Sequence, residues 1–361
     1  MTREEHRGMI LHRWFPARRH GDVLAMRTLL EAAISLLLAS AKRAQAGARN
    51  LWKRLPLSVR GRVYLASRWT GLLHVLSHLA TYDETHDPGT FAGNLVVVHQ
   101  QYTGGSADEK EKLEKQFDKI MEGLAMPNGV QKTTRRLRQH SILAKVLADE
   151  RCRPQKSAIT VLDVPSSSGV AALDSIAILS QYYTIRAYVL GDLCFHVYYD
   201  TSRECVFDED FTLLQVRFEK RFFSIHRGHG SGDVYTPLAR VLLFPLDVVA
   251  WYLKKKYVYS TKSHTVPLSL IHPDVYARLS RGDFSVSKMD IFKGIRERYD
   301  LILSFNFLQR NYFPQEQIAR GVENLTNALN EQGFLIMGND VSFSVAQKRE
   351  GKLVVIKEDS V

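Results

Sequence analysis

The sequence contains few cysteines, since Cys152, Cys194 and Cys205 are the three in 361 residues. They are too few and too widely spaced for a disulfide framework, which indicates a protein of a reducing compartment. The chain also lacks an apolar run of the roughly 18 to 20 residues that a membrane-spanning helix needs. We therefore expect a cytoplasmic protein, whose only association with a membrane would be peripheral.

One segment has some features of a secretory leader, namely the apolar stretch 26–41 followed by Ala44-Gln45-Ala46. Glu31 interrupts this stretch, and Lys42 and Arg43 stand directly before the supposed cleavage site, which is atypical of a signal peptide. The pattern favours an amphipathic helix.

Two nucleotide-binding motifs are absent. No G-x-G-x-x-G follows a predicted strand, which disfavours a nicotinamide or flavin site, and no G-x-x-x-x-G-K-S/T is present, which argues against a P-loop. A ligand site must therefore be sought in other turns between strands and helices.

Acidic residues are scarce near the N-terminus, where residues 1–70 hold 14 Lys and Arg against 4 Asp and Glu. The whole chain carries a formal net charge of +11, so the remainder is close to neutral. A basic arm suits an anionic membrane surface or nucleic acid, although a solvated basic segment fits equally. A second candidate for membrane contact is 238–256, an apolar segment that ends in three lysines. Of the two partners, nucleic acid is the less favoured.

The hydrophobic pattern divides the chain into three parts. Residues 1–70 read as a basic helical arm, 71–156 as a helical lid or substrate region, and 157–361 as an α/β domain. Almost a hundred residues separate the second and third predicted strands of that domain, far more than one crossover helix needs. We therefore expect an insertion at about 200–270.

Two helices are predicted before the α/β domain. Ser106-Ala-Asp-Glu109 is a capping box that opens a helix with one apolar face. A second helix is expected at about 131–148, with Leu137, Leu143, Val146 and Leu147 on its packing face. Both apolar stripes indicate packing and carry no chemistry.

From residue 157 onward, strand and helix patterns alternate. Strands are predicted at 159–164, 185–190, 285–289, 299–304 and 334–338, and their alternation with helices favours a parallel sheet. Pro314 and the helical spacing that follows predict a helix at about 314–330, between the last two strands. The segments 341–347 and 353–357 predict a closing hairpin. The expected fold is a doubly wound α/β sheet with an antiparallel edge.

The turn after the first strand is the most informative part of the sequence. Asp163 ends the apolar run, Val164 to Gly169 form a turn of mainly small residues, and a helix begins at Val170. A buried parallel strand that turns tightly into a helix N-terminus is where an open α/β sheet binds its ligand. Small residues there let a ligand approach the backbone closely.

Four motifs in this order resemble the class I S-adenosylmethionine-dependent methyltransferases, whose fold is Rossmann-like. They are the first turn up to Gly169, Asp192 after the second strand, Asp290 after the third, and the block from Tyr299 to Gly338. The last block is especially similar to chemotaxis-receptor methyltransferases. The resemblance covers about 157–361 without the insertion, and implies S-adenosylmethionine as the cofactor.

The resemblance also implies roles for individual residues. Asp192 would hold the ribose hydroxyls and Asp290 the adenine amino group, with apolar neighbours against the ring. The implied cofactor-binding set is Asp163, Pro165, Ser166, Ser167, Ser168, Gly169, Asp192, Leu193, Asp290, Ile291, Ser304 and Asn306. The family's glycines are replaced by proline and serine at Pro165 and Ser167, which leaves Gly169 as the remaining one. This departure bears on affinity more than on the location of the site.

Several of these residues also have a purely structural interpretation. Asp163 suits a helix cap, and Asn306 suits a turn. The candidates for a general base or acceptor contact are Asn306, Tyr312 and His196, with His264 and His272 as further histidines. A zinc site built from His226, His229 and Cys205 is disfavoured, because no paired C-x-x-C accompanies them and the surroundings are glycine-rich.

Three functions remain open. The favoured one is an enzyme that transfers a methyl group to an oxygen or nitrogen atom of a small, lipid-like or peptide acceptor. The second is a non-catalytic methyltransferase-like module that binds or regulates, which Pro165 and Ser167 motivate. The third is a nucleic-acid-binding protein that uses the basic arm, and its affinity would fall steeply with salt.

Overall fold

The computed structural model describes residues 88–127, 130–132, 136–137, 139–218, 221–226, 237–262, 264–279, 281–310, 312–339 and 342–360. The chain divides into two compact units, and the one described below comprises 85–234 with 250–361. The other unit, 1–84 with 235–249, lies mostly outside the described residues. The predicted basic arm at 1–70 lies wholly outside them, so its helical structure and partners stay predictions.

The larger sheet contains seven strands in the order β12-β11-β10-β9-β1-β2-β8. Its parallel strands are β1 (Ala158–Asp163), β2 (Thr184–Asp192), β8 (Ser285–Lys288), β9 (Tyr299–Phe305) and β10 (Leu329–Gly338). Counted along the chain they lie in the order 3-2-1-4-5, which is the doubly wound, Rossmann-like order. An antiparallel hairpin, β11 (Ser342–Arg349) and β12 (Lys352–Ser360), extends the β10 edge. The predicted fold class is confirmed.

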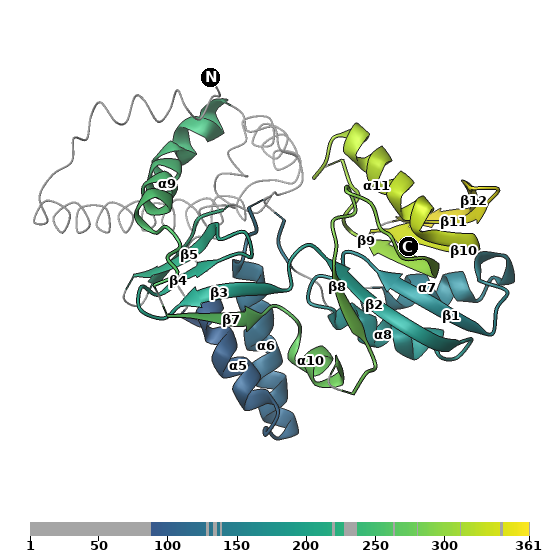
Figure 1. The fold of residues 1–361 in the computed structure, drawn as a ribbon, viewed down its shortest axis with the longest axis horizontal. Coiled ribbons are helices and arrows are strands. Elements are labelled where there is room, and N and C mark those ends of the chain that lie inside the picture. The colour runs from purple at the N-terminus through teal and green to yellow at the C-terminus, as the bar shows by residue number, and fades with distance from the viewer. Residues whose placement is uncertain are drawn as a thin grey trace, which may run out of the picture. The chain divides into compact units, whose positions relative to one another are not determined.

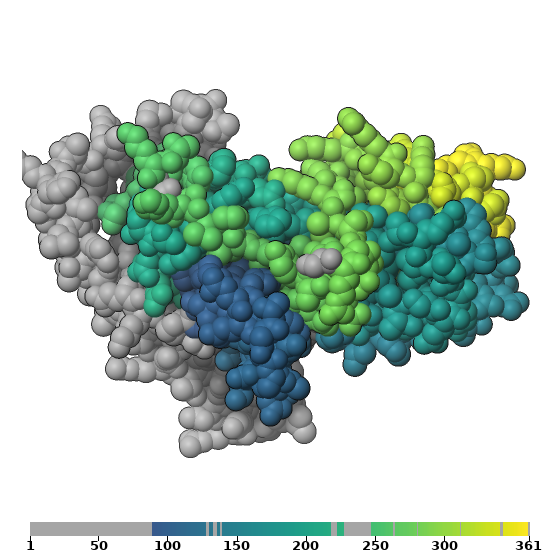
Figure 2. Space-filling model, turned by 60° about the horizontal axis from the view of Figure 1, so that its bottom comes forward, coloured from purple at the N-terminus to yellow at the C-terminus, as the bar shows by residue number. Residues whose placement is uncertain are grey.

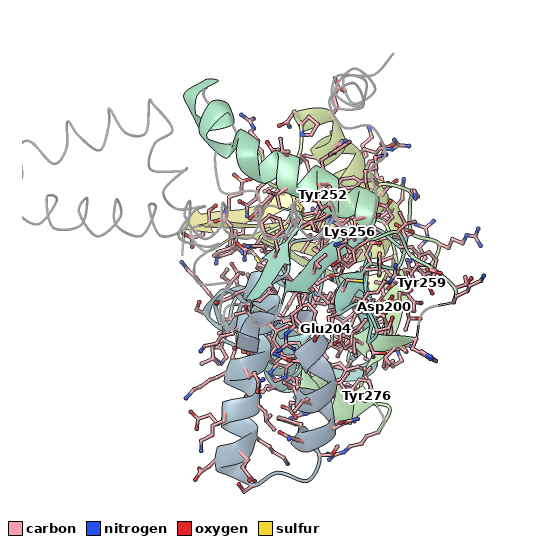
Figure 3. All side chains as sticks on the ribbon, turned by 90° about the vertical axis from the view of Figure 1, so that its left-hand side faces the viewer. Asp200, Glu204, Tyr252, Lys256, Tyr259 and Tyr276 are labelled. Atoms are coloured by element: carbon pink, nitrogen blue, oxygen red, sulfur yellow. The ribbon has the colours of Figure 1, made fainter. Side chains whose placement is uncertain are left out.

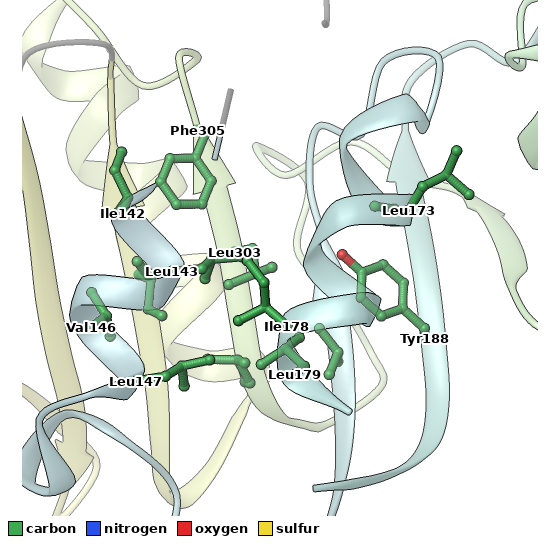
Figure 4. Close-up of a cluster of buried hydrophobic side chains, with 14 of the residues drawn as sticks. Ile142, Leu143, Val146, Leu147, Leu173, Ile178, Leu179, Tyr188, Leu303 and Phe305 are labelled. Atoms are coloured by element: carbon green, nitrogen blue, oxygen red, sulfur yellow. The ribbon is translucent and has the colours of Figure 1, made fainter. Parts of the chain in front are cut away.

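Helices cover both faces of this sheet (Figure 1). They are α7 (His140–Leu147) and α8 (Val170–Leu179) on one face and α11 (Gln315–Ala328) on the other. Because side chains alternate along a strand, Leu301 and Leu303 of β9 pack with α7 and α8, whereas Ile302 packs with α11. Figure 4 shows Leu303 in the first of these clusters, near Leu143 of α7.

The region between β2 and β8 forms a second, antiparallel sheet in the order β6-β5-β4-β3-β7. Its strands are β3 (His196–Asp200), β4 (Cys205–Phe207), β5 (Leu213–Phe218), β6 (Arg221–Ser224) and β7 (Thr265–Ser269). The inserted sheet therefore begins directly after β2, slightly earlier than the predicted 200. Helix α10 (Pro273–Leu279) then leads the chain back to β8.

The turn between β3 and β4 is closed by Asp200, which Figure 3 shows together with Tyr259 on this part of the molecule. The Asp200 carboxylate accepts hydrogen bonds from the Ser202 backbone N–H at 3.0 Å and from Arg203 Nε at 2.6 Å. Nearby, the Tyr259 ring stacks on Phe211 with 3.9 Å between ring centroids. These contacts keep the turn and the adjoining loop compact.

Helices α5 (Leu95–Tyr102) and α6 (Ala107–Gly123) pack on the second sheet (Figure 1). Phe117 of α6 lies in one buried cluster with Leu214 and Leu268 of the sheet. Figure 2 shows the two helices beside the segment that holds β7 and α10. Residues 95–123 and the inserted sheet thus share one hydrophobic core.

The capping box at the start of α6 is confirmed. Ser106 Oγ accepts the Glu109 backbone N–H at 3.4 Å, and Glu109 Oε2 accepts the Ser106 backbone N–H at 2.8 Å. The two bonds satisfy N–H groups that have no partner within the helix. The apolar face predicted for this helix is buried as well.

The second predicted helix, at about 131–148, is wrong in its first half. The structure has α7 only from His140, while Gln131 pairs with Ala125 in an isolated β-bridge. Leu137, expected on the packing face, has a positive φ of 61° and is 64% exposed. We attribute the difference to a contact between residues far apart in the sequence, since the Lys132 side chain bonds to Asp192 at the end of β2.

Helix α9 (Pro237–Lys256) occupies the apolar segment that the sequence singled out for possible membrane contact. Its side chains are described from Asp247 onward, and there Val249 and Leu253 are buried while Lys254 to Lys256 are exposed. No helix among the described residues combines the length and apolarity that crossing a bilayer requires. Contact of 238–256 with a membrane surface stays a prediction.

Candidate functional site

A cavity of about 420 Å³ lies at the carboxyl ends of β1, β2, β8 and β9. The strand order reverses between β1 and β9, and an open α/β sheet binds its ligand at such a reversal. Two further walls come from outside the large sheet: the segment 126–132 before α7, and the turn 208–210 between β4 and β5. Three parts of the chain thus enclose one site.

The first turn places its backbone against this cavity. Gly169 has a φ of +78°, and a Cβ atom there would lie 2.9 Å from Leu190 Cδ1, so only glycine fits at the start of α8. Ser167 also has a positive φ, of 56°, although it carries a side chain. The resemblance expects glycine at positions 165 and 167, where this sequence has proline and serine. At position 167 the backbone nevertheless has the positive φ that is typical of glycine.

Asp163 lies beneath the turn and is 2% exposed. The Tyr188 hydroxyl donates to its Oδ2 at 3.2 Å. Burial raises the pKa of Asp163 to about 7, an effect that the Tyr188 hydrogen bond opposes and the nearby Asp192 charge reinforces. Asp163 does not line the cavity, and its side-chain hydrogen bond to Tyr188 joins β1 to β2.

Asp192, at the end of β2, lines the cavity and is already bonded by three donors. Its Oδ1 accepts from Lys132 Nζ at 2.6 Å and from the Cys194 backbone N–H at 3.3 Å. Its Oδ2 accepts from the Ser167 backbone N–H at 2.8 Å. Because a carboxylate offers about four lone-pair positions, roughly one remains for a ligand.

Three buried hydroxyls near the strand ends have no hydrogen-bond partner among the described residues, namely those of Ser166, Ser167 and Ser304. Ser166 and Ser167 line the cavity. A buried polar group without a partner is uncommon and costs stability, so it points to a missing ligand or water. Ser168 is buried behind them, and its backbone oxygen accepts from the His272 N–H.

The third strand end supplies an acid and an apolar wall. Asp290 is half-buried, and its Oδ1 accepts the Phe292 backbone N–H at 3.0 Å. Ile291 and Phe292 line the cavity beside it, and the Phe292 ring lies 5.0 Å from Phe313. Phe313 in turn lies 4.8 Å from Phe307, so three aromatic rings form one side of the cavity.

The structure separates the candidate catalytic residues. Asn306 and Tyr312 line the cavity, and Asn306 has a positive φ of 58° at the end of β9. His196 is exposed on β3 and does not line it. His264 and His272 do not line the cavity either. Burial lowers the pKa of His272 to about 4, and the His272 ring packs on Phe117. Leu193, from the predicted cofactor set, does line the cavity.

The turn between β4 and β5 adds three acids to the wall. Asp208 is 5% exposed, and its Oδ1 accepts backbone N–H groups from Asp210 and Thr212 at 3.0 and 2.7 Å. Glu209 accepts from the Phe195 N–H at 3.0 Å and forms an ion pair with Lys288. The inserted sheet is thereby joined to the end of β8.

Sequence reasoning missed Lys132 and the acids at 208–210. Lys132 lay within a segment interpreted as helix, and no local signal distinguishes it from other basic residues there. Three consecutive acids between apolar runs are a turn signal, but only the folded sheet brings that turn to the strand ends. Tertiary proximity, rather than a motif, identifies both.

No group of three or more metal-ligating side chains is found among the described residues. His226 contacts the backbone oxygen of Leu213 at 3.1 Å through Nε2, and Cys205 is fully buried in β4. His229, the third residue of the disfavoured zinc site, lies outside the described residues.

Comparison with known proteins finds no matching family profile and no matching curated protein. Similar solved structures include the N-methyltransferase NodS from Bradyrhizobium japonicum WM9 with S-adenosyl-L-homocysteine, at 12% identity and a TM-score of 0.25. The magnesium protoporphyrin IX methyltransferase ChlM from Synechocystis PCC 6803, with bound S-adenosylmethionine, is 13% identical, also with a TM-score of 0.25. An O-methyltransferase family 2 protein from Planctomyces limnophilus, in complex with apigenin, is 15% identical with a TM-score of 0.25.

These alignments cover 56%, 58% and 64% of this chain and 62%, 60% and 43% of the other chains, respectively. This chain thus spans less than two thirds of each similar structure. The fold is assigned from the sheet itself, whose 3-2-1-4-5 parallel order, with a cavity at the reversal, is that of a doubly wound, Rossmann-like fold. The doubly wound sheet predicted from the sequence is therefore confirmed.

Proposed function

We propose that this protein transfers a methyl group from S-adenosylmethionine to an oxygen or nitrogen nucleophile of a small, lipid-like or peptide acceptor. One observation supports the proposal: most of the predicted ligand-binding residues line one cavity from separate strand ends, although Asp163, Ser168, Gly169 and Ser304 do not line it. The predicted residues that do line it are Pro165 to Ser167 after β1, Asp192 and Leu193 after β2, Asp290 and Ile291 after β8, and Asn306 after β9.

The residues present suit an adenosyl group. The unpartnered hydroxyls of Ser166 and Ser167 offer hydrogen bonds, and Asp290 offers a half-buried carboxylate oxygen for an exocyclic amine. Ile291 and the aromatic rings beside it offer an apolar surface for a purine. The cavity volume of about 420 Å³ lies in the range of cofactor sites, ~300 to 1,000 Å³.

When bound, S-adenosylmethionine supplies an activated methyl group. The protein would contribute mainly position and orientation, which by themselves lower such a barrier substantially. Asn306 and Tyr312 both line the cavity, and each has a side chain that can form a hydrogen bond to the nucleophile. The apolar side chains of Met126, Val130 and Phe307 favour an acceptor with an apolar part.

The proposal is tested by calorimetry with S-adenosylhomocysteine on the wild type, on Asp290→Ala and on Asp283→Ala. Asp283 is an exposed aspartate just before β8, at the opposite end of that strand, and serves as the matched control. We expect micromolar binding, weakened at least ten-fold (~1.4 kcal/mol) by Asp290→Ala and unchanged by Asp283→Ala. Absence of binding to the wild type would reject the proposal.

A second function, a nucleoside-binding module without transfer, is favoured by one observation. Lys132 already compensates the Asp192 charge, which removes an attraction for a cationic sulfonium. Affinities for S-adenosylmethionine and S-adenosylhomocysteine separate the two functions. A clear preference for the neutral product-like molecule, with no methyl transfer to amine, hydroxyl or carboxyl acceptors, would favour the module.

A further inference from the structure

We propose that Lys132 is a ligand-binding residue that, together with Asp192, recognises the vicinal hydroxyls of a ribose. The proposal rests on the proposed function for the identity of the ligand as an adenine nucleoside. It adds a contact from outside the large sheet, in a segment to which the sequence assigned no chemistry.

The two side chains form an ion pair in the wall of the cavity. Lys132 Nζ lies 2.6 Å from Asp192 Oδ1, and the side chains are 5% and 9% exposed. Both residues line the cavity. Lys132 Nζ also lies over the Phe195 ring, 6.0 Å from its centroid, which gives the side chain a second contact.

The hydrogen-bonding capacity of Lys132 is not used up. An ammonium group has three donors, and Asp192 is its one hydrogen-bond acceptor among the described residues. Because a buried charged donor without an acceptor is costly, the remaining donors favour ligand oxygens at this place. The unpartnered hydroxyls of Ser166 and Ser167 belong to the same wall.

The pair as a whole offers both a donor and an acceptor. Asp192 retains about one lone-pair position after its bonds to Lys132, Cys194 and Ser167. A hydroxyl group both donates and accepts, so one hydroxyl of a diol can accept from Lys132 while its neighbour donates to Asp192. An ammonium ligand could not accept from Lys132, and a carboxylate ligand could not donate to Asp192. The vicinal diol of ribose, in the adenine nucleoside that the proposed function implies, matches both.

The test combines protein variants with ligands that lack one hydroxyl. Adenosine, 2′-deoxyadenosine and 3′-deoxyadenosine are titrated calorimetrically into the wild type, Lys132→Met and Lys156→Met. Lys156 is the matched control, since it forms an ion pair of the same 2.6 Å length with Asp300 but does not line the cavity. A purely structural role of Lys132 would weaken all three ligands by the same factor.

We expect removal of either hydroxyl to weaken binding at least ten-fold in the wild type and in Lys156→Met. In Lys132→Met, adenosine should bind at least ten-fold more weakly than in the wild type. In that variant, removal of the hydroxyl that contacts Lys132 should weaken binding by no more than a further two-fold. Because Lys132→Met leaves a buried charge on Asp192, the double variant Lys132→Met with Asp192→Asn is measured too. This neutral pair should bind all three ligands with similar affinity.

Other outcomes overturn the inference. If adenosine binds and both hydroxyl penalties persist in the Lys132 variants, Lys132 does not contact the diol, although the proposed function stands. Tighter adenosine binding by Lys132→Met would show that the lysine competes with the ligand for Asp192. If neither adenosine nor S-adenosylhomocysteine binds the wild type, the proposed function itself fails.

Discussion

Two residues, one in the first turn and one after β9, adopt left-handed backbone conformations that are uncommon for residues other than glycine. Ser167 has a φ of +56° and Asn306 a φ of +58°, and both line the cavity. Left-handed conformations of this kind persist in proteins where the surrounding structure imposes them, commonly at binding sites. At Ser167 the backbone N–H donates to Asp192 at 2.8 Å, which is one contact that holds the residue in place.

Glycine at position 167 should relieve this strain. We expect Ser167→Gly to stabilise the protein by roughly 0.5 to 1 kcal/mol, because the left-handed penalty and a buried hydroxyl without a partner are both removed. Chemical unfolding in urea measures the change. Ser166→Gly is the control, because it removes the same kind of unpartnered buried hydroxyl at a residue without a positive φ, so it should lack the gain that comes from relief of the left-handed backbone. Equal losses in the two variants would contradict the account.

Among the elements, α6 and the inserted sheet depend on one another for burial. Phe117 of α6 is completely buried and contacts the His272 ring at 5.3 Å between centroids. The same sheet carries the turn at 208–210, which forms one wall of the cavity. Loss of this packing should therefore affect both stability and ligand binding.

Truncation of Phe117 tests this dependence. We expect Phe117→Ala to lower the free energy of unfolding by ~3 to 5 kcal/mol, the usual cost of emptying a buried aromatic site. Phe211→Ala, in the turn between β4 and β5 and 46% exposed, should cost far less. Urea unfolding followed by circular dichroism compares the two, and similar costs would show that α6 is not a core element.

At the scale of the whole molecule, stability should depend on pH through Asp163. Burial raises its pKa to about 7 in the folded protein, against ~3.9 in an unfolded chain. Between these values the folded state binds more protons than the unfolded state, so this residue contributes less stability as the pH rises from about 4 to 7. The loss levels off above pH 7.

Asparagine at position 163 should abolish this dependence. It can still accept the hydrogen bond from Tyr188, but it does not ionise. We expect Asp163→Asn to gain stability relative to the wild type between pH 5 and pH 8, by up to a few kcal/mol at ~1.4 kcal/mol per pKa unit. Unfolding free energies measured at the two pH values give the difference, and a constant difference would mean that Asp163 is ionised throughout.

The sequence predicted the elements whose signals are local. Strand β9 is buried along its whole length and therefore appears as an apolar run, and the capping box at Ser106 needs only residues 106–109. The first turn was found because Gly169 and its small neighbours lie together in the chain. Its place in the fold followed from the alternation of strands and helices.

Local signals failed where a distant partner decides the structure. The pattern at 131–148 predicts one helix, but the helix begins only at His140. Before it, Lys132 pairs with Asp192, which lies 60 residues further along the chain. Strand β10 begins at Leu329 rather than near Phe334, because Leu329 already pairs with Tyr299 of β9. In both cases a long-range contact outweighed a weak local preference.

Neighbouring residues in the sequence are enough to predict the doubly wound sheet and the strand ends that line the cavity, because burial and turn formation depend on local patterns. Folding alone brings the remaining parts of the cavity wall together, namely Lys132 against Asp192 and the acids at 208–210, and leaves His196 outside it. Those contacts join segments far apart in the chain, and their energies arise only when folding removes both partners from water.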